Sequence, residues 1–120
     1  MSGTYSDLEV WQAAMDLAIH IYCVTKTFPK EETYGLTSQL RRAAVSVPSN
    51  IAEGKGRPSD KDTVHFLGNS RGSLFEIETQ VAIARRLGYL SAEQGEIISG
   101  RTLRVGQLLN GLMRALRKVA

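Results

Sequence analysis

Six polar residues at helical spacings are the strongest candidates for chemistry in this sequence. Arg42, Asn50 and Glu53 follow one another at intervals of eight and three residues, which places them on roughly one face of a helix. An arginine guanidinium binds carboxylates and phosphates through paired hydrogen bonds. The group is therefore either a phosphate- or partner-binding cluster or, the interpretation we favour, an inter-helix polar network that fixes register. Its members are Arg41, Arg42, Asn50, Glu53, Glu76 and Glu78.

Basic residues form the second candidate group. Residues 85–120 carry seven basic and two acidic side chains, whereas residues 1–84 carry eight basic and ten acidic ones. A basic stripe neutralises nucleic-acid phosphates without reading bases, and such binding weakens with salt. The alternative, which the pattern favours, is a solvated helix face. The residues predicted to contact an RNA or DNA backbone are Lys55, Arg57, Arg104, Arg114, Arg117 and Lys118.

No pattern predicts a catalytic residue, a metal site or a cofactor. A di-iron site in a helix bundle needs repeated Glu-x-x-His motifs, and the chain offers only Asp62-x-x-His65. The glycine-rich loop around Lys55 lacks the spacing and the preceding strand of a Walker loop. Cys23 has no His or Asn partner in the pattern, so we interpret it as a small buried hydrophobe. We therefore predict that the protein is not an enzyme.

Four helices are predicted to position these side chains, over about residues 7–27, 35–53, 59–87 and 91–118. Two capping boxes, Ser6 with Glu9 and Ser91 with Gln94, mark helix starts. Ser59 is predicted to cap the third helix, and Gly54 and Gly88 to end the second and third. Long helices with short loops indicate an all-α protein, an antiparallel up-down four-helix bundle that spans residues 1–120 as one domain. No apolar run reaches the ~18 residues of a membrane span, so we expect a cytoplasmic protein without a membrane partner.

The first helix carries apolar residues on two opposed flanks. Trp11, Met15 and Tyr22 lie on one flank, which we assign to the core, and a second seam lies opposite. A helix that is apolar almost all round is buried on more than one side, so the second seam should pack on another copy of the chain. The predicted subunit interface is Val10, Leu17, Ile21, Val24 and Leu103. Glycines within the last two helices, such as Gly68 and Gly72, are interpreted as points of close approach.

The segments YSDLEVWQ (residues 5–12), RRAAVSVPSNIAEG (41–54), GSLFEIETQ (72–80) and LGYL (87–90) resemble a known family. They are similar to the small bacterial four-helix proteins encoded within intervening sequences of 23S ribosomal RNA genes. The resemblance implies ring-like homo-oligomers, typically homopentamers, of largely unassigned role. It also implies a relationship to the accessory proteins of diversity-generating retroelements, which bind nucleic acid through a basic surface.

These observations predict a non-enzymatic, oligomeric four-helix protein that acts as a scaffold or accessory factor. The alternative is an accessory protein that binds RNA or DNA without sequence preference, through the basic surface of residues 91–118 and the loop at residues 55–57. The two functions are compatible, because a ring multiplies a weak basic surface by avidity.

Overall fold

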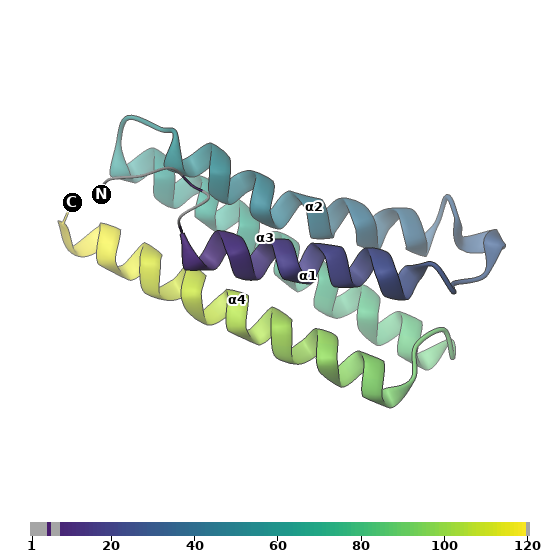
Figure 1. The fold of residues 1–120 in the computed structure, drawn as a ribbon. Coiled ribbons are helices and arrows are strands. Elements are labelled where there is room, and N and C mark those ends of the chain that lie inside the picture. Colours follow the sequence, from purple (N-terminus) through teal and green to yellow (C-terminus); the bar gives the residue numbers. More distant parts are fainter. Residues whose placement is uncertain (1–4, 6–7, 120) are drawn as a thin grey trace.

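The computed structural model describes Tyr5 and residues 8–119, which contain four α-helices and no β-strand (Figure 1). The helices are α1 (Glu9–Thr25), α2 (Leu36–Lys55), α3 (Asp60–Arg86) and α4 (Ala92–Val119), with a 3-10 helix, η2 (Lys30–Glu32), before α2. Each long helix packs along the next, and α4 packs back against α1, so the helices enclose a single apolar core (Figure 1). The predicted all-α class is confirmed.

Local capping chemistry sets several of the helix ends. The amide of Asp62 donates to Ser59 Oγ at 3.1 Å, and Gly88 adopts a left-handed φ of 80° directly after the end of α3. The capping box before α4 is complete, because Gln94 N donates to Ser91 Oγ at 3.1 Å and Ser91 N donates to Gln94 Oε1 at 3.0 Å. These three signals are confirmed as they were read from the sequence.

Two other helix ends differ from the prediction. The N-cap of α1 is Leu8 and carries no side-chain cap, while the predicted cap residue, Ser6, lies outside the described residues. The prediction that Gly54 ends α2 is wrong, because the helix continues through it to Lys55 and Gly56 supplies the cap. Gly54 is instead buried, which indicates a packing role.

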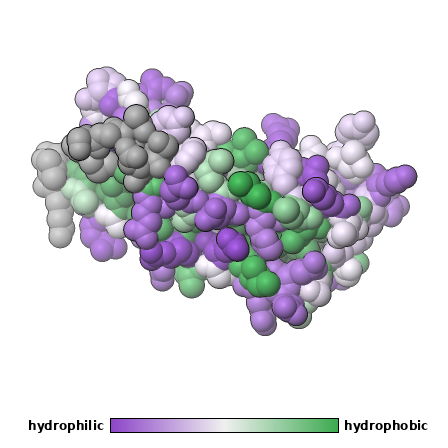
Figure 2. Space-filling model, viewed as in Figure 1, coloured by the Kyte–Doolittle hydropathy of each residue, from purple (hydrophilic) through white to green (hydrophobic). Residues whose placement is uncertain are grey.

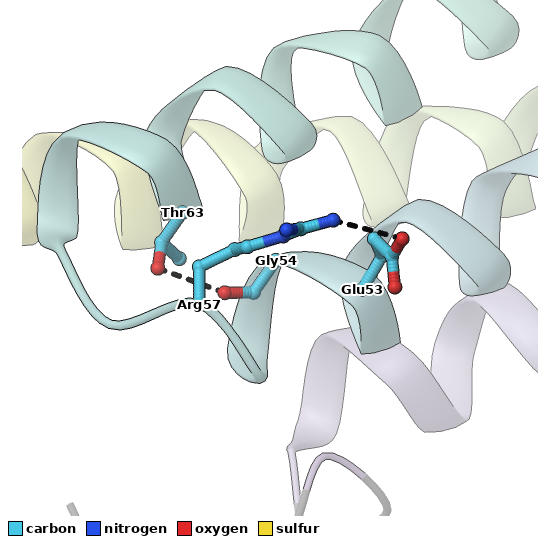
Figure 3. A network of polar contacts seen from close by, with 4 residues as sticks. All are labelled: Glu53, Gly54, Arg57 and Thr63. Atoms are coloured by element: carbon cyan, nitrogen blue, oxygen red, sulfur yellow. Dashed lines mark hydrogen bonds and ion pairs between the residues drawn. The ribbon is translucent and has the colours of Figure 1, made fainter.

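Gly54 allows the start of α3 to approach α2 closely (Figure 3). Thr63 Oγ1 donates to the carbonyl of Gly54 at 2.8 Å. A Cβ at Gly54 would lie 3.0 Å from Phe66 Cβ and 3.2 Å from the Thr63 carbonyl oxygen. Arg57 closes the same corner, since its guanidinium pairs with Glu53 at 2.9 Å and lies 4.4 Å above the Phe66 ring.

Replacing Gly54 by alanine is expected to lower the free energy of unfolding by about 1–3 kcal/mol, because the new methyl group presses on α3. Gly72→Ala is the matched control: an added Cβ there meets nothing within 4 Å. Because alanine has a higher helix propensity than glycine, Gly72→Ala should raise the free energy of unfolding by about 0.5–1 kcal/mol. Urea unfolding of dilute protein, followed by circular dichroism, measures both changes. Effects of the same sign would contradict the packing role of Gly54.

Most glycines of α3 and α4 do not mark close approaches within the chain. A Cβ added at Gly68, Gly72, Gly100 or Gly111 would meet nothing within 4 Å, and at Gly106 it would meet only Leu74 Cδ1, at 3.8 Å. Within the single chain these positions are therefore not points of close approach, and a close approach by another chain stays a prediction. Most of these glycines lie on the outer side of their helices, where no neighbouring helix packs.

The apolar flank of α1 that was predicted to form a subunit interface is in fact part of the core. Leu17 and Ile21 are fully buried, and Val10 and Val24 are 5% and 8% exposed. Ala14 and Phe28 are also buried and complete this seam at steps of three and four. Four of the five predicted interface residues, Val10, Leu17, Ile21 and Val24, are thus unavailable to a partner. The fifth, Leu103, is 61% exposed.

Candidate functional site

The structure divides the predicted polar network among four places. Arg41 turns toward α1, where its Nε donates to Thr25 Oγ1 at 2.9 Å and its Nη2 donates to the Tyr22 carbonyl at 3.3 Å. Its guanidinium also lies 4.7 Å above the Tyr22 ring. Glu53 pairs with Arg57 at the α2–α3 corner, and Glu78 is exposed on α3. A single network of the six predicted residues therefore does not form in this structure.

A polar groove between α2 and α3 brings two of the remaining residues, Arg42 and Glu76, together. Its volume is about 420 Å³. We call it the polar groove, and its lining is Gln39, Arg42, Ala43, Ser46, Ser73, Glu76 and Gln80.

Hydrogen-bonded hydroxyl groups join the two walls of the polar groove. Ser73 Oγ on α3 lies 2.8 Å from Ser46 Oγ on α2. Asn50 Nδ2 donates to both the carbonyl and the hydroxyl oxygen of Ser46, each at 2.9 Å. One turn along α3, Ser70 Oγ donates to the carbonyl of Val47 at 2.8 Å. This bond also crosses between the helices, so the two walls are held at a fixed separation.

Three polar side chains of the groove have no partner among the described residues. Arg42 and Glu76 are exposed and form no ion pair, either with each other or with another described side chain. Gln80 is only 9% exposed, and its buried Oε1 accepts no hydrogen bond. Buried amide groups are almost always hydrogen-bonded in folded proteins, so an unpaired one calls for an explanation. The groove thus combines a rigid base with unsatisfied donors and acceptors.

A second groove, between α3 and α4, is strongly basic. Its volume is about 430 Å³, and no carboxylate lines it. Arg71 Nη1 donates to Asn110 Oδ1 at 3.2 Å, which holds that guanidinium beside α4. We call it the basic groove, and its lining is Arg71, Asn110, Met113, Arg114 and Arg117. Arg114 and Arg117 belong to the predicted nucleic-acid contacts, whereas Arg71 does not.

The other predicted nucleic-acid contacts lie elsewhere. Arg104 forms an ion pair with Glu9 of α1, and Arg57 is held by Glu53 and Phe66. Lys55 and Arg57 both line a hollow near the start of α3, apart from the basic groove. The side chain of Lys118 lies outside the part of the chain that the structure describes. The six predicted residues therefore do not form one continuous surface.

A third groove, between α1 and α2, is apolar and holds about 680 Å³. Its lining includes Trp11, Met15, Ile19, Tyr22 and Val45. Ile19 is 57% exposed and Val45 is 44% exposed. Cys23, predicted to be buried, is exposed and lines this groove, so that prediction is wrong. Figure 2 shows hydrophobic side chains between polar ones on the face that carries α1. We call the groove between α1 and α2 the apolar groove.

Comparison with known proteins identifies the family. The family model for 23S rRNA-intervening sequence protein matches residues 6–111. This chain belongs to that family. A solved structure from Bacteroides thetaiotaomicron, described as a protein with unknown function from the S23 ribosomal protein family, superposes with a TM-score of 0.78. It is 21% identical, and the match covers 87% of this chain and 97% of that one. No curated protein matches.

Membership of the 23S rRNA-intervening sequence protein family brings a fold but no assigned activity. At 21% identity the solved relative supports the arrangement of helices alone. Among the described residues of this family member, no group of three or more His, Cys, Asp or Glu side chains is placed to hold a metal ion. No helix in the same part of the chain is both long and apolar enough to cross a membrane.

Ser46, Ser73 and Gln80 of the polar groove and Arg71 of the basic groove were missed by reasoning from the sequence of this family member, whereas Asn50 and Glu76 were among the predicted residues. Ser73, Glu76 and Gln80 follow one another at steps of three and four, which marks one face of α3. Ser46 and Asn50 are four apart on α2. These spacings were present in the sequence, but serine and glutamine carry no charge to attract notice. Arg71 was missed because only the packing of α3 on α4 brings it beside Arg114 and Arg117.

Proposed function

We propose that this protein is a non-enzymatic, self-associating subunit that acts in the cytoplasm as a scaffold or accessory factor. In this proposal the up-down four-helix bundle is the building block of a homo-oligomeric ring, typically a homopentamer by resemblance to the family. The observation that carries the proposal is the apolar groove between α1 and α2. A contiguous apolar surface rimmed by polar residues marks a protein interaction site in a folded domain.

The occupant proposed for the apolar groove is a second copy of the chain. Phe75 on α3 and Leu103 on α4 are 59% and 61% exposed, so the chain itself carries apolar side chains that no intrachain contact covers. The four helices pack in a closed order, because α1 does not contact α3 and α2 does not contact α4. The face formed by α1 and α2 is therefore on the opposite side of the molecule from the face formed by α3 and α4. A contact between two different faces is heterologous, and it closes into a ring when the rotation that relates successive subunits returns to the first one.

The single cysteine reports on this contact without any mutation. Cys23 is exposed in the isolated subunit and lines the apolar groove. We expect a thiol reagent to label it slowly in concentrated protein and faster after dilution, because dissociation uncovers the groove. A labelling rate that stays the same across a dilution in which the mass falls from that of the oligomer to that of the single subunit would contradict the occupant proposed here.

Binding of RNA or DNA backbone is the second candidate function, and the basic groove favours it. Three guanidinium groups and an amide converge there without a neutralising carboxylate. Arginine pairs with phosphate through two parallel hydrogen bonds, so the groove fits a phosphodiester backbone. The relationship to retroelement accessory proteins stays part of this second proposal.

Binding to a labelled single-stranded RNA across a salt series tests the second candidate. We expect sequence-independent binding that weakens with salt, and Arg71→Gln should reduce the slope of log K against log salt by about 0.7. Arg86→Gln, a change of the same charge at an exposed position of α3 outside the basic groove, is the control. Equal slopes for the two variants, or no binding at low salt, would remove this candidate.

A further inference from the structure

We propose that the polar groove between α2 and α3 binds a small zwitterion, a free α-amino acid. The ligand carboxylate lies at Arg42 on the α2 wall, and the ligand ammonium lies at Glu76 on the α3 wall. The groove volume of about 420 Å³ falls within the range of small-molecule sites. Its lining is almost wholly polar, with Ala43 as the exception. This function is separate from self-association and from binding of a nucleic acid.

The α3 wall offers a carboxylate for an ammonium group. Ser73, Glu76 and Gln80 stand three and four residues apart on one face, so their side chains line the groove in a row. An ammonium group has three donors and no acceptor. The Glu76 carboxylate is exposed and supplies both the compensating charge and the acceptors.

The α2 wall offers the complementary group. Arg42 is exposed and has no described carboxylate within ion-pair distance, so both edges of its guanidinium are open to a carboxylate. Gln39, three residues earlier, lines the same wall and adds an amide. A ligand carboxylate between these side chains would occupy the donors that the chain leaves unused.

The pairing of charges across the groove selects the ligand class. A phosphate or another simple anion at Arg42 would also face the Glu76 carboxylate, and a simple amine at Glu76 would face the Arg42 guanidinium. A ligand with both charges satisfies both walls. The hydrogen bond between Ser46 and Ser73 joins the two walls at the base of the groove, and Arg42 and Glu76 form no ion pair with each other.

The experiment uses the full chain and the twenty common α-amino acids as probes. Each is added at millimolar concentration, thermal unfolding is recorded, and the best stabiliser is titrated by calorimetry. A ligand that binds only the folded state raises Tm. We expect at least one amino acid to do so, and its N-acetyl and carboxamide derivatives, which each lack one charge, to bind at least tenfold more weakly. No shift with any of the twenty, or equal binding of the derivatives, would overturn the proposal.

Matched variants locate the site. Arg42→Gln and Glu76→Gln are each expected to weaken binding at least tenfold while leaving Tm without ligand unchanged, since neither side chain has an intrachain partner. Arg86→Gln and Glu78→Gln make the same charge changes at exposed positions outside the groove and should bind as the original chain does. If the groove variants retain full binding, the assignment is wrong. If they instead alter the oligomeric mass and no amino acid binds, the groove is a subunit contact and the proposal also fails.

Discussion

Replacing Ile19 by glutamate is expected to break the proposed oligomer into single subunits while leaving the fold of each subunit intact. Ile19 is 57% exposed on α1 and lines the apolar groove, so the isolated subunit tolerates a carboxylate there. In the assembly the same carboxylate would be buried without a partner, at a cost of about 3 kcal/mol for each contact. Association at each contact should weaken about 100-fold. Sedimentation velocity over a dilution series measures the change.

The control for Ile19→Glu is Asn69→Glu, which adds the same charge at an exposed position of α3 that lines none of the three grooves. It should sediment as the original chain does. Circular dichroism should show the same helical content for both variants. If Ile19→Glu and Asn69→Glu sediment alike, the apolar groove is not the contact surface.

Shortening Leu17 to alanine is expected to lower the free energy of unfolding of the subunit by about 3 kcal/mol. Leu17 is fully buried in the core, and removing its side chain leaves a cavity that the surrounding helices fill only in part. Urea unfolding of protein diluted below its association range measures the change without a contribution from assembly. The expected loss is a large fraction of the stability of a small domain.

Ile19→Ala is the comparison for Leu17→Ala, two residues away on the same helix. Ile19 is on the exposed flank of α1. The free energy of unfolding of the diluted Ile19→Ala subunit should therefore differ from that of the original subunit by less than about 0.5 kcal/mol. In contrast, Ile19→Ala should weaken assembly. The reverse pattern, with Leu17→Ala affecting assembly and Ile19→Ala affecting subunit stability, would restore the interface that was predicted from the sequence.

Local signals of the sequence were sufficient for several helix ends. Ser59, Ser91 with Gln94, and Gly88 act through residues three or four positions away, so no knowledge of tertiary packing is needed to interpret them. Gly54 failed as a stop signal because its role is tertiary: Phe66 and Thr63 pack against it. A glycine stop and a glycine contact look the same in a sequence.

The choice between the two flanks of α1 also depended on tertiary packing. Both flanks repeat at steps of three and four, and periodicity alone does not rank them. The flank with Leu17 and Ile21 became the core, and the flank with Trp11 and Tyr22 stayed partly exposed. Tyrosine and tryptophan have polar atoms that suit a partly exposed position, and this chemical difference was the signal available.

The candidate sites follow the boundaries between consecutive helices. The apolar groove lies between α1 and α2, the polar groove between α2 and α3, and the basic groove between α3 and α4. The sequence supplied Arg42 and Glu76 as candidates. Their positions on facing walls of one groove, without an ion pair between them, depend on the register between α2 and α3. Such a register is set by core packing and by bonds such as Ser73 to Ser46.

The mass of the dilute protein tests self-association most directly. Sedimentation equilibrium of the unmodified chain at micromolar concentration should give a multiple of the subunit mass of 13.2 kDa, and a fivefold multiple if the ring is a homopentamer. A single ideal species at 13.2 kDa, unchanged as the concentration rises, would contradict self-association.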